Sequence, residues 1–319
     1  MLGKNRVIAL EEHYWDPAIA ETFDGREGRA PAIRERLDDV GELRIKEMDA
    51  AGIDVQVLSQ GAPGTQRLEA ATAVDLARKA NDRLHQMVLA HPDRFAAFAT
   101  LPTPDPKAAA DELQRTVTEF GFKGAMVHGP TNGVFFDDRR FWPIFERAQA
   151  LDVPLYIHPS LPHPAVIEAY YKDYLADFPG LQSAAWGYTV ETATQGIRII
   201  LSGVFDEYPD VKIILGHLGE SLPFSIWRID HVLSRPGNKP ARVKELFARN
   251  FWITTSGNFS TPALLCSMME LGVDRILFSV DYPFVENMPG VEWMKGSPLS
   301  PDDTTKILNG NAARLLKME

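Results

Sequence analysis

Eight short runs of apolar and β-branched residues, separated by helical segments, constrain the fold of this 319-residue chain most strongly. The runs predict strands at residues 7–10, 55–58, 95–99, 124–127, 155–158, 212–215, 251–254 and 275–279. Such near-continuous apolar strands are typical of a parallel sheet that is covered on both faces. Eight strand–helix units favour an α/β fold in which the sheet closes into a (β/α)8 TIM barrel.

The alternative to a closed barrel is an open, doubly wound sheet, which has the same alternation of elements. The chain has no Gly-x-Gly-x-x-Gly motif after the first predicted strand, which weighs against that alternative. No repeat or low-complexity linker divides the sequence, so we expect residues 1–319 to form a single barrel domain. Two stretches, 24–32 and 159–181, are expected insertions at the C-terminal mouth of the barrel. Residues 170–174 are expected to form a helix over that mouth.

The composition argues against several classes of function. The net charge of −10 argues against a nucleic-acid surface. No run approaches the ~20 apolar residues of a membrane span, and residues 7–10 are too short an apolar run for a signal peptide. The one cysteine, Cys266, cannot form an internal disulfide, and its apolar surroundings predict a core position. We therefore expect a cytoplasmic protein with no nucleic-acid or membrane partner.

Acidic residues and histidines occur where several predicted strands end. Glu11 and His13 follow the first strand, the fifth ends in His158, and Asp281 follows the eighth. In a βα barrel these strand ends converge on one mouth. Glu11 and His13 are two residues apart and so point the same way on a strand, whereas Glu12 points elsewhere. Two carboxylates and two imidazoles around one point predict a site for one divalent ion, zinc or manganese, or magnesium.

Each of these residues also has an ordinary structural interpretation. A lone histidine at a strand end is more often hydrogen-bonded within the fold than a ligand, which applies to His158 and His217. Asp281 could shape a turn, and Glu11 would face solvent if the first strand were shifted by one residue. The joint pattern favours the metal site, because four ionisable groups in one cavity are costly without a cation. The histidines expected to face solvent are His85, His91, His163 and His231.

Longer motifs carry a family resemblance that runs from the first strand to the C-terminus. The segments are 9–13 (ALEEH), 92–95 (PDRF), 121–125 (GFKGA), 214–220 (ILGHLGE), 227–230 (WRID), 252–257 (WITTSG) and 274–283 (DRILFSVDYP). With them the chain resembles the aminocarboxymuconate-semialdehyde decarboxylase (ACMSD) branch of the amidohydrolase superfamily. Within that branch it resembles the ortho-hydroxybenzoate decarboxylases, such as the γ-resorcylate and 2,3-dihydroxybenzoate enzymes. Hydrolytic members carry His-x-His in the first motif, whereas this chain has Glu11-x-His13, as the γ-resorcylate type does.

The resemblance implies a set of site residues and an assembly. The metal ligands that it implies are Glu11, His13, His158 and Asp281. The second part of the site that it implies consists of His217, Glu220 and Arg228, and the assembly is a homodimer or homotetramer. One departure is His128, where the γ-resorcylate enzymes carry asparagine, and the long aromatic loop after the fifth strand is another. Both would line the pocket, so the substituents on the substrate ring stay open.

These residues suit the non-oxidative decarboxylation of an aromatic acid with an ortho hydroxyl, such as 2,6- or 2,3-dihydroxybenzoate or salicylate. The ion would hold one carboxylate oxygen and the ortho phenolate. Asp281 is the expected proton donor, with a pKa raised by burial and by the anionic substrate. His217, hydrogen-bonded to Glu220, would relay the proton. Arg228 would hold Glu220 or meet the carboxylate, or it forms an ordinary helix ion pair with Asp230. The side chains expected to contact the ring are Phe23, His128, Trp186 and Tyr188.

Two other functions would use the same scaffold. A metal-dependent hydrolase of a lactone or an amide would use activated water, with Asp281 as the base. The acidic ligand Glu11 would make the ion a poorer activator of water than a histidine would, which weighs against hydrolysis. A catalytically silent binding protein is the third hypothesis, and the presence of all the site residues weighs against it.

Overall fold

A ring of parallel strands forms the centre of the molecule. The structure is a computed structural model that describes residues 6–23 and 30–318. The strands pair in the order β1-β2-β3 and β4-β5-β6-β7-β8-β9, and every pair is parallel. Their bounds are β1 Ile8–Tyr14, β2 Val55–Gln60, β3 Phe95–Ala97, β4 Ala99–Thr100, β5 Ala125–His128, β6 Pro154–His158, β7 Lys212–Leu215, β8 Phe251–Thr254 and β9 Ile276–Leu277.

Two junctions close these strands into a barrel. The first is at Phe98, which separates β3 from β4 within the predicted strand 95–99, and whose N–H donates to Leu58 O at 2.9 Å. The second is a parallel bridge between Glu12 and Tyr282, with His13 N donating to Tyr282 O at 2.7 Å. The chain therefore forms the predicted (β/α)8 barrel, with the third of its eight strands divided in two, and not the open sheet.

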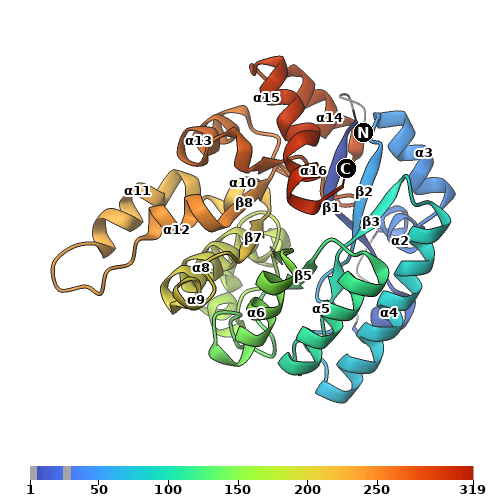
Figure 1. The fold of residues 1–319 in the computed structure, drawn as a ribbon. Helices are drawn as coiled ribbons and strands as arrows, with labels where there is room; N and C mark the ends of the chain where they lie inside the picture. The colour runs from blue at the N-terminus through green and yellow to red at the C-terminus, as the bar shows by residue number, and fades with distance from the viewer. Residues whose placement is uncertain (1–5, 24–29, 319) are drawn as a thin grey trace.

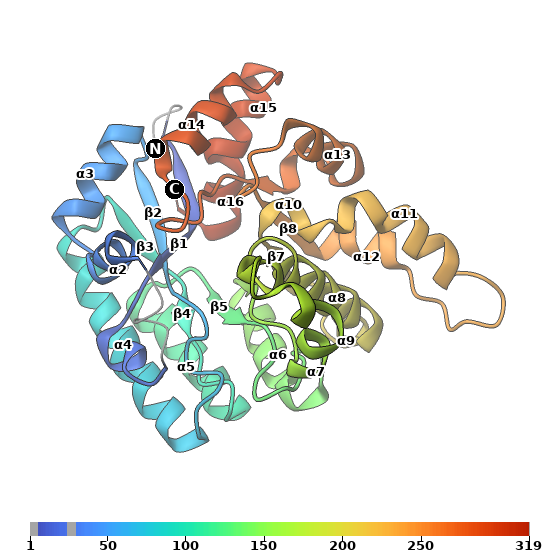
Figure 2. The same cartoon turned by 180° about the vertical axis from the view of Figure 1, so that it is seen from behind.

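Helices surround the ring on its outside (Figures 1 and 2). Among them α5 is bounded as its sequence predicts: Pro106 occupies its first turn, Asp105 caps it, and Gly121 ends it with a positive φ. Helices α11 and α12 project from the side of the barrel. The longer helices are α2 Pro31–Asp38, α3 Glu42–Ala51, α4 Ala70–Ala90, α5 Pro106–Phe120, α6 Trp142–Leu151, α8 Gly187–Ser202, α11 Leu222–Leu233, α12 Val243–Asn250, α13 Thr261–Leu271 and α14 Asn287–Gly296. The shorter ones are α1 Pro17–Ala20, α7 Pro164–Val166, α9 Val204–Glu207, α10 His217–Glu220, α15 Pro301–Thr305 and α16 Asn311–Leu316.

The interior of the barrel is apolar at its base. Ile8, Leu10, Val57 and Ile214 are fully buried there, in a cluster that also contains Leu315 of α16. Helix α16 therefore packs against the lower end of the barrel. Because this lower part is filled by hydrophobic side chains, polar groups of the strands can gather only at the opposite end.

The last predicted strand is shorter than expected, and the first is longer. Residues 275–279 were the expected strand, but β9 ends at Leu277 because Phe278 N donates to Ile307 O at 3.0 Å. The acceptor, Ile307 O, belongs to η7 (Lys306–Gly310). In the same turn Asn309 Nδ2 donates to Arg6 O at 2.7 Å, so the first described residue lies against the last helical turns.

The two expected insertions differ in what can be said of them. Residues 24–29 of the first lie outside the described residues, and α2 begins at Pro31. The second is helical as predicted, but it forms short turns and no single helix. These turns are α7, η3 (Ile167–Tyr171), η4 (Lys172–Tyr174) and η5 (Pro179–Gln182). In the part of the chain that the structure describes, no helix combines the length and the apolar character needed to cross a bilayer.

Candidate metal centre and active site

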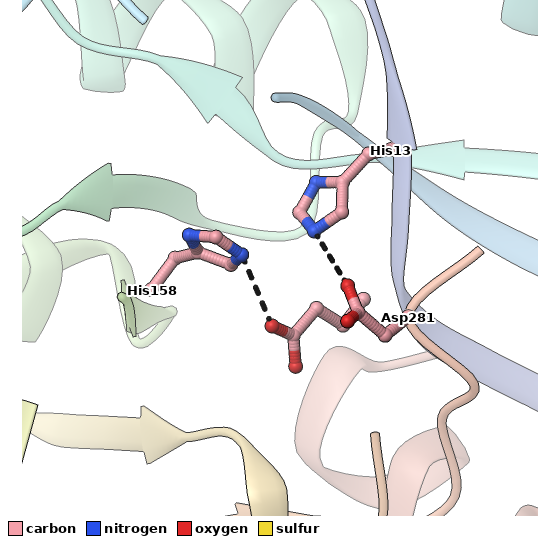
Figure 3. Close-up of side chains that lie close together, drawn as sticks. His13, His158 and Asp281 are labelled. Carbon is pink, nitrogen blue, oxygen red and sulfur yellow. Dashed lines mark ion pairs between the residues drawn. The ribbon is translucent and has the colours of Figure 1, made fainter. Parts of the chain in front are cut away.

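Four predicted ligands meet at the C-terminal end of the barrel. Glu11 and His13 lie on β1, His158 ends β6, and Asp281 follows β9. One candidate ligand atom from each lies within 4.8 Å of all the others. His13 Nε2 is 3.3 Å from Asp281 Oδ1, and His158 Nε2 is 3.3 Å from Glu11 Oε1. Figure 3 shows His13 of β1, His158 of β6 and Asp281 of the segment after β9 converging on one point.

The register of β1 places these side chains. Ala9 pairs with Gln56 and Glu12 pairs with Leu58, so β1 contains one residue more than β2 between these pairs. Such a bulge redirects side chains locally. Beyond it Glu11 and His13 both contribute to the ligand cluster, whereas Glu12 is turned toward residues 279–282. The alternation predicted from the sequence is therefore present.

Glu11 is held through one of its carboxylate oxygens. Its Oε2 accepts hydrogen bonds from the hydroxyls of Tyr156 and Ser256, with Thr254 Oγ1 at 3.4 Å. Its Oε1 is buried and accepts no hydrogen bond within the described residues. Burial raises the pKa of Glu11, while the positive charge of His217 acts to lower it. A bound cation would offset that burial cost, so an ion fits this position.

Each of the two imidazoles, of His13 and of His158, likewise presents one nitrogen to the site. His13 Nδ1 lies 3.1 Å from Ser59 Oγ, and His158 Nδ1 lies 2.7 Å from Pro159 O. These partners leave both Nε2 atoms facing the carboxylates, with the pKa of His158 held well below its usual value by burial and by His13. His13 Nε2 and Asp281 Oδ1 are buried without a hydrogen-bond partner among the described residues. A neutral imidazole nitrogen and a free carboxylate oxygen are metal ligands, so this donor set fits a divalent ion.

His217 and Glu220 form a pair beside Asp281. His217 Nδ1 lies 2.8 Å from Glu220 Oε1, as the sequence predicted, and its Nε2 lies 3.8 Å from Asp281 Oδ2. Burial acts to lower the pKa of His217, but Glu220 and Glu11 outweigh it and hold this pKa well above its usual value. The side chains of His217 and Asp281 are 22% and 15% exposed, against 0% for His13. The site therefore opens to solvent on the side of His217.

The segment that carries this pair has an uncommon backbone. Five consecutive residues, His217 to Ser221, have φ between +50° and +79°, and only Gly219 among them is a glycine. A non-glycine residue in this region costs about 1–2 kcal/mol. The surrounding contacts hold it: His217 N donates to Ser256 Oγ at 3.1 Å, and Asn258 Nδ2 donates to His217 O at 3.3 Å. This backbone conformation places the imidazole of His217 beside Asp281.

Two histidines set the pKa of Asp281 in the protein without substrate. Burial acts to raise this pKa, as expected, but the neighbouring imidazoles of His13 and His217 outweigh it and lower the pKa below its ordinary value. In the protein without substrate the pKa of Asp281 is therefore not raised, and the rise expected beside an anionic substrate stays a prediction. The neighbouring group whose pKa is raised is His217.

His128 contacts a ligand residue. Its Nδ1 lies 3.0 Å from His158 Nδ1, and burial, with His13, lowers its pKa to about 3. Its backbone N–H donates to Gln66 Oε1. A neutral His128 can thus help to orient the ring of His158. The loops that follow β5 and β6 line a cavity of about 370 Å³, whose lining includes Arg67, Pro130 and Ser160 but none of the four candidate ligands.

The aromatic residues expected at the ring lie at different distances from this centre. Phe23 is half-buried against Trp15, with ring centroids 5.7 Å apart. The same small cluster contains Phe284, whose ring lies 5.7 Å from that of His13. Tyr188 is half-buried at the start of α8, and Trp186, just before it, is 49% exposed. Phe23 is therefore linked to the metal centre through Phe284.

Arg228 does not contact the pair that it was expected to hold. It is exposed on α11, and among the described residues it forms no ion pair with Glu220 or with Asp230. Asp230 Oδ1 instead accepts a hydrogen bond from Lys244 N at 3.0 Å, and Glu220 Oε2 has no hydrogen-bond partner in the described chain. The resemblance named Arg228, but the position of its helix directs it to solvent.

The exposure of the remaining histidines and of the cysteine agrees only in part with the prediction. His163 and His231 are exposed as predicted, whereas His85 and His91 are half-buried. His85 stacks on Phe120 with ring centroids 4.0 Å apart, because both lie on helices that pack together. Cys266 is half-buried, not fully in the core.

Sequence reasoning missed the hydroxyl groups that hold Glu11. Tyr156 lies two residues before His158 on β6, and Ser256 lies two residues after Thr254 of β8. The same two-residue rule that selected Glu11 and His13 would have placed Tyr156 on the side of His158. Glu12 was set aside because it points away from the ligands.

Comparison with known proteins agrees with this geometry. The amidohydrolase family model matches residues 11–318. A γ-resorcylate decarboxylase from a Polaromonas species is 41% identical, over 98% of this chain and 99% of that protein. A crystal structure of 2,6-dihydroxybenzoate decarboxylase in complex with 2,6-dihydroxybenzoate has a TM-score of 0.91 and 40% identity, covering 98% of this chain and 99% of that one. A dihydroxybenzoic acid decarboxylase from Polaromonas, with bound manganese and the inhibitor 2-nitroresorcinol, has the same TM-score and identity over 98% of this chain and 97% of that one. This chain therefore belongs to the amidohydrolase family.

Proposed function

We propose that this protein is a carboxy-lyase that removes CO2, without oxidation, from an aromatic acid with an ortho hydroxyl group. The substrate that we propose first is 2,6-dihydroxybenzoate. The observation that carries the proposal is the cluster of Glu11, His13, His158 and Asp281, with His217 beside it. It is supported by full-length relatives that are named as decarboxylases of this acid.

The cofactor that we propose is one divalent ion, held by Glu11, His13, His158 and Asp281. Manganese is the first candidate because a neighbouring structure contains it, with zinc and magnesium as the alternatives. When bound, the ion would act as a Lewis acid toward the carboxylate and ortho oxygens of the substrate.

Protons would reach the substrate through His217 and Asp281. His217, kept protonated by Glu220, would pass its proton to Asp281 across the 3.8 Å between Nε2 and Oδ2. Asp281 would then protonate the ring carbon that carries the carboxylate. The bond from that carbon to the carboxylate breaks, its electron pair returns to the ring, and CO2 leaves. Atoms and charge balance, since one proton replaces one CO2.

The remaining assignments are proposals about binding. We propose that Phe23, Tyr188 and Trp186 pack around the aromatic ring, supported for Phe23 by its contact with the Trp15 cluster. His128 is proposed to shape the same pocket through its contact with His158. We also propose that residues 1–319 form one domain, and that the protein acts in the cytoplasm, which the single cysteine supports.

An assembly of several copies is also proposed. Phe224 and Trp227 on α11 are 85% and 63% exposed, and Met269 on the neighbouring α13 is 86% exposed. Large exposed apolar side chains on two helices in contact are typical of a subunit interface. This surface, with Leu265, is called the α11–α13 face below. A homodimer or homotetramer would cover it.

A substrate assay tests the reaction. The purified protein, loaded in turn with manganese, zinc and magnesium, is incubated with 2,6-dihydroxybenzoate, 2,3-dihydroxybenzoate and salicylate. We expect loss of the substrate absorbance with release of the phenol and CO2 for at least the first acid. Turnover of lactones or amides without turnover of any ortho-hydroxybenzoate would support the hydrolase instead.

The variant Asp281→Asn tests the proton path. We expect turnover to fall at least ~1,000-fold, because an amide can neither carry the proton nor ligate as a carboxylate does. Circular dichroism should show an unchanged fold. A rate near that of the wild type would remove Asp281 from the mechanism.

A further inference from the structure

We propose that Glu12 is a positioning residue, whose carboxylate fixes the backbone on both sides of Asp281. In this way Glu12 would hold the Asp281 side chain toward the other ligands, although Glu12 itself faces away from them. The inference rests on the proposed function for its kinetic consequence. Its structural consequence, a change in metal affinity, does not depend on which acid is the substrate.

The carboxylate of Glu12 is fully buried and accepts three hydrogen bonds from one short segment. Its Oε1 accepts from Ser279 Oγ and from Val280 N, each at 3.0 Å. Its Oε2 accepts from Tyr282 N at 3.2 Å. Val280 and Tyr282 are the two neighbours of Asp281 in the chain, so one side chain fixes the peptide N–H groups before and after it.

The segment needs such a partner because the strand before it has ended. β9 stops at Leu277, and no strand partner satisfies the N–H groups of Val280 and Tyr282 among the described residues. Asp281 has a φ of +76°, in the left-handed region that non-glycine residues rarely occupy. A backbone of this kind persists only when its surroundings fix it. Glu12 accepts the hydrogen bonds from the two peptide N–H groups on either side of Asp281.

The same network reaches the ligands on β1. Ser279 Oγ, which donates to Glu12, also accepts from Glu11 N at 2.6 Å. On the other side the buried Arg44 donates to His13 O at 2.5 Å, and its guanidinium lies 4.5 Å from the centre of the Tyr282 ring. Glu12 thus connects the loop of Asp281 to the strand of Glu11 and His13. Displacement of this connection would change the distances between ligands without removing any ligand.

The variant Glu12→Gln tests this role. It keeps the shape of the side chain but turns an amide N–H₂ toward groups that are themselves donors, so at least one of the three contacts is lost. We expect the dissociation constant for Mn²⁺, measured by electron paramagnetic resonance titration of metal-free protein, to rise ~10–100-fold. At saturating Mn²⁺ we expect kcat to fall at least ~10-fold, with KM for 2,6-dihydroxybenzoate changed less than ~3-fold.

Glu112→Gln is the matched control. Glu112 is a buried carboxylate that accepts from Asn81 Nδ2 at 2.8 Å and pairs with Arg115, between α4 and α5. Loss of the Glu112 carboxylate should lower the melting temperature, while Mn²⁺ affinity and kcat stay at wild-type values. If Glu12→Gln behaves like this control, with a lower melting temperature and unchanged Mn²⁺ affinity and kcat, the positioning role is wrong.

A second variant and a second readout cover the remaining outcomes. If Glu12→Gln does not fold, Glu12→Asp withdraws the carboxyl group by one methylene from Val280 N and Tyr282 N, and it leaves the contact between Ser279 Oγ and Glu11 N in place. A folded Glu12→Asp with a weaker Mn²⁺ affinity, by about 3-fold or more, supports the role, and an unchanged affinity contradicts it. If the wild type turns over no hydroxybenzoate, the proposed function fails, but the Mn²⁺ titrations still decide whether Glu12 positions Asp281.

Discussion

Three of the four candidate ligands, Glu11, His13 and His158, divide their side chains between the protein and the metal centre. Glu11 Oε2, His13 Nδ1 and His158 Nδ1 contact hydroxyl or carbonyl groups, and the second atom of each side chain faces the site. Partners of this kind fix the orientation and the tautomer of a ligand before an ion arrives. The metal affinity should therefore depend on residues that never touch the ion.

Tyr156→Phe tests this dependence. The change removes the hydroxyl that donates to Glu11 Oε2, so we expect the dissociation constant for Mn²⁺ to rise ~10-fold or more. Tyr14→Phe is the control, because Tyr14 is equally buried but its hydroxyl has no hydrogen-bond partner in the described residues. Equal Mn²⁺ affinities for the two variants would show that the Tyr156 hydroxyl does not hold Glu11.

At the scale of single residues the sequence predicted identities better than charges. The spacing of Glu11 and His13, and the ends of the predicted strands 155–158 and 275–279, were sufficient to select the four candidate ligands that lie together in the structure. The pKa of Asp281 was not predictable, because it depends on how close two imidazoles approach a buried carboxylate. The solvent-facing position of Arg228 was equally hidden, since it depends on where α11 packs.

At the scale of elements, the link from β7 to α11 is the most constrained. Its left-handed residues include Ser221, which is exposed and makes no capping hydrogen bond to α11. Ser221→Gly should therefore raise the free energy of unfolding by about 0.5–1 kcal/mol, since glycine accepts φ = +65° without strain. Ser225→Gly, within α11, should lower it by about 0.5 kcal/mol. Urea unfolding of both variants measures the difference, and a destabilised Ser221→Gly would contradict the strain.

Helix α8 contains a carboxylate whose burial should make stability depend on pH. Burial raises the pKa of Glu191 from 4.5 to about 6, although Arg198 acts to lower it. Folding therefore favours the protonated form, and this contribution is present below about pH 4.5 and is lost as the pH rises through 6. The loss of stability is at most about 2 kcal/mol.

Glu191→Gln should melt at a higher temperature than the wild type at pH 8, with no such gain at pH 4. The control is Glu292→Gln, at an exposed position on α14, and equal effects of both changes would exclude the burial of Glu191 as the cause.

The existence of the elements was easier to predict than their ends. All eight strand positions followed from apolar runs, because a buried parallel strand needs hydrophobic residues on both faces. The end of β9 depends on a hydrogen bond from Phe278 N to Ile307 O, a residue distant in sequence. The division at Phe98 depends likewise on which neighbouring strand each peptide meets. No local pattern contains that information.

At the scale of the whole molecule, the α11–α13 face predicts association. We expect the wild type to elute with a mass that is a multiple of 35.5 kDa in size-exclusion chromatography with light scattering. Trp227→Glu should shift it toward the monomer, because a charge would be buried in an apolar contact. Lys79→Glu on α4, an exposed position elsewhere, should not. A monomeric wild type would contradict the proposed assembly.

The first and last parts of the described chain meet on the side of the barrel opposite the metal centre. Arg6 and Met318 line the same cavity, and Asn309 joins the last helical turns to Arg6 O. A ring of strands has no first or last member in space, and only the covalent chain assigns one. A short linker between these ends would remove that distinction, and the chain could then be opened in the exposed loop after α11. Circular permutation would thus separate the order of synthesis of the strands from the geometry of the site that they build.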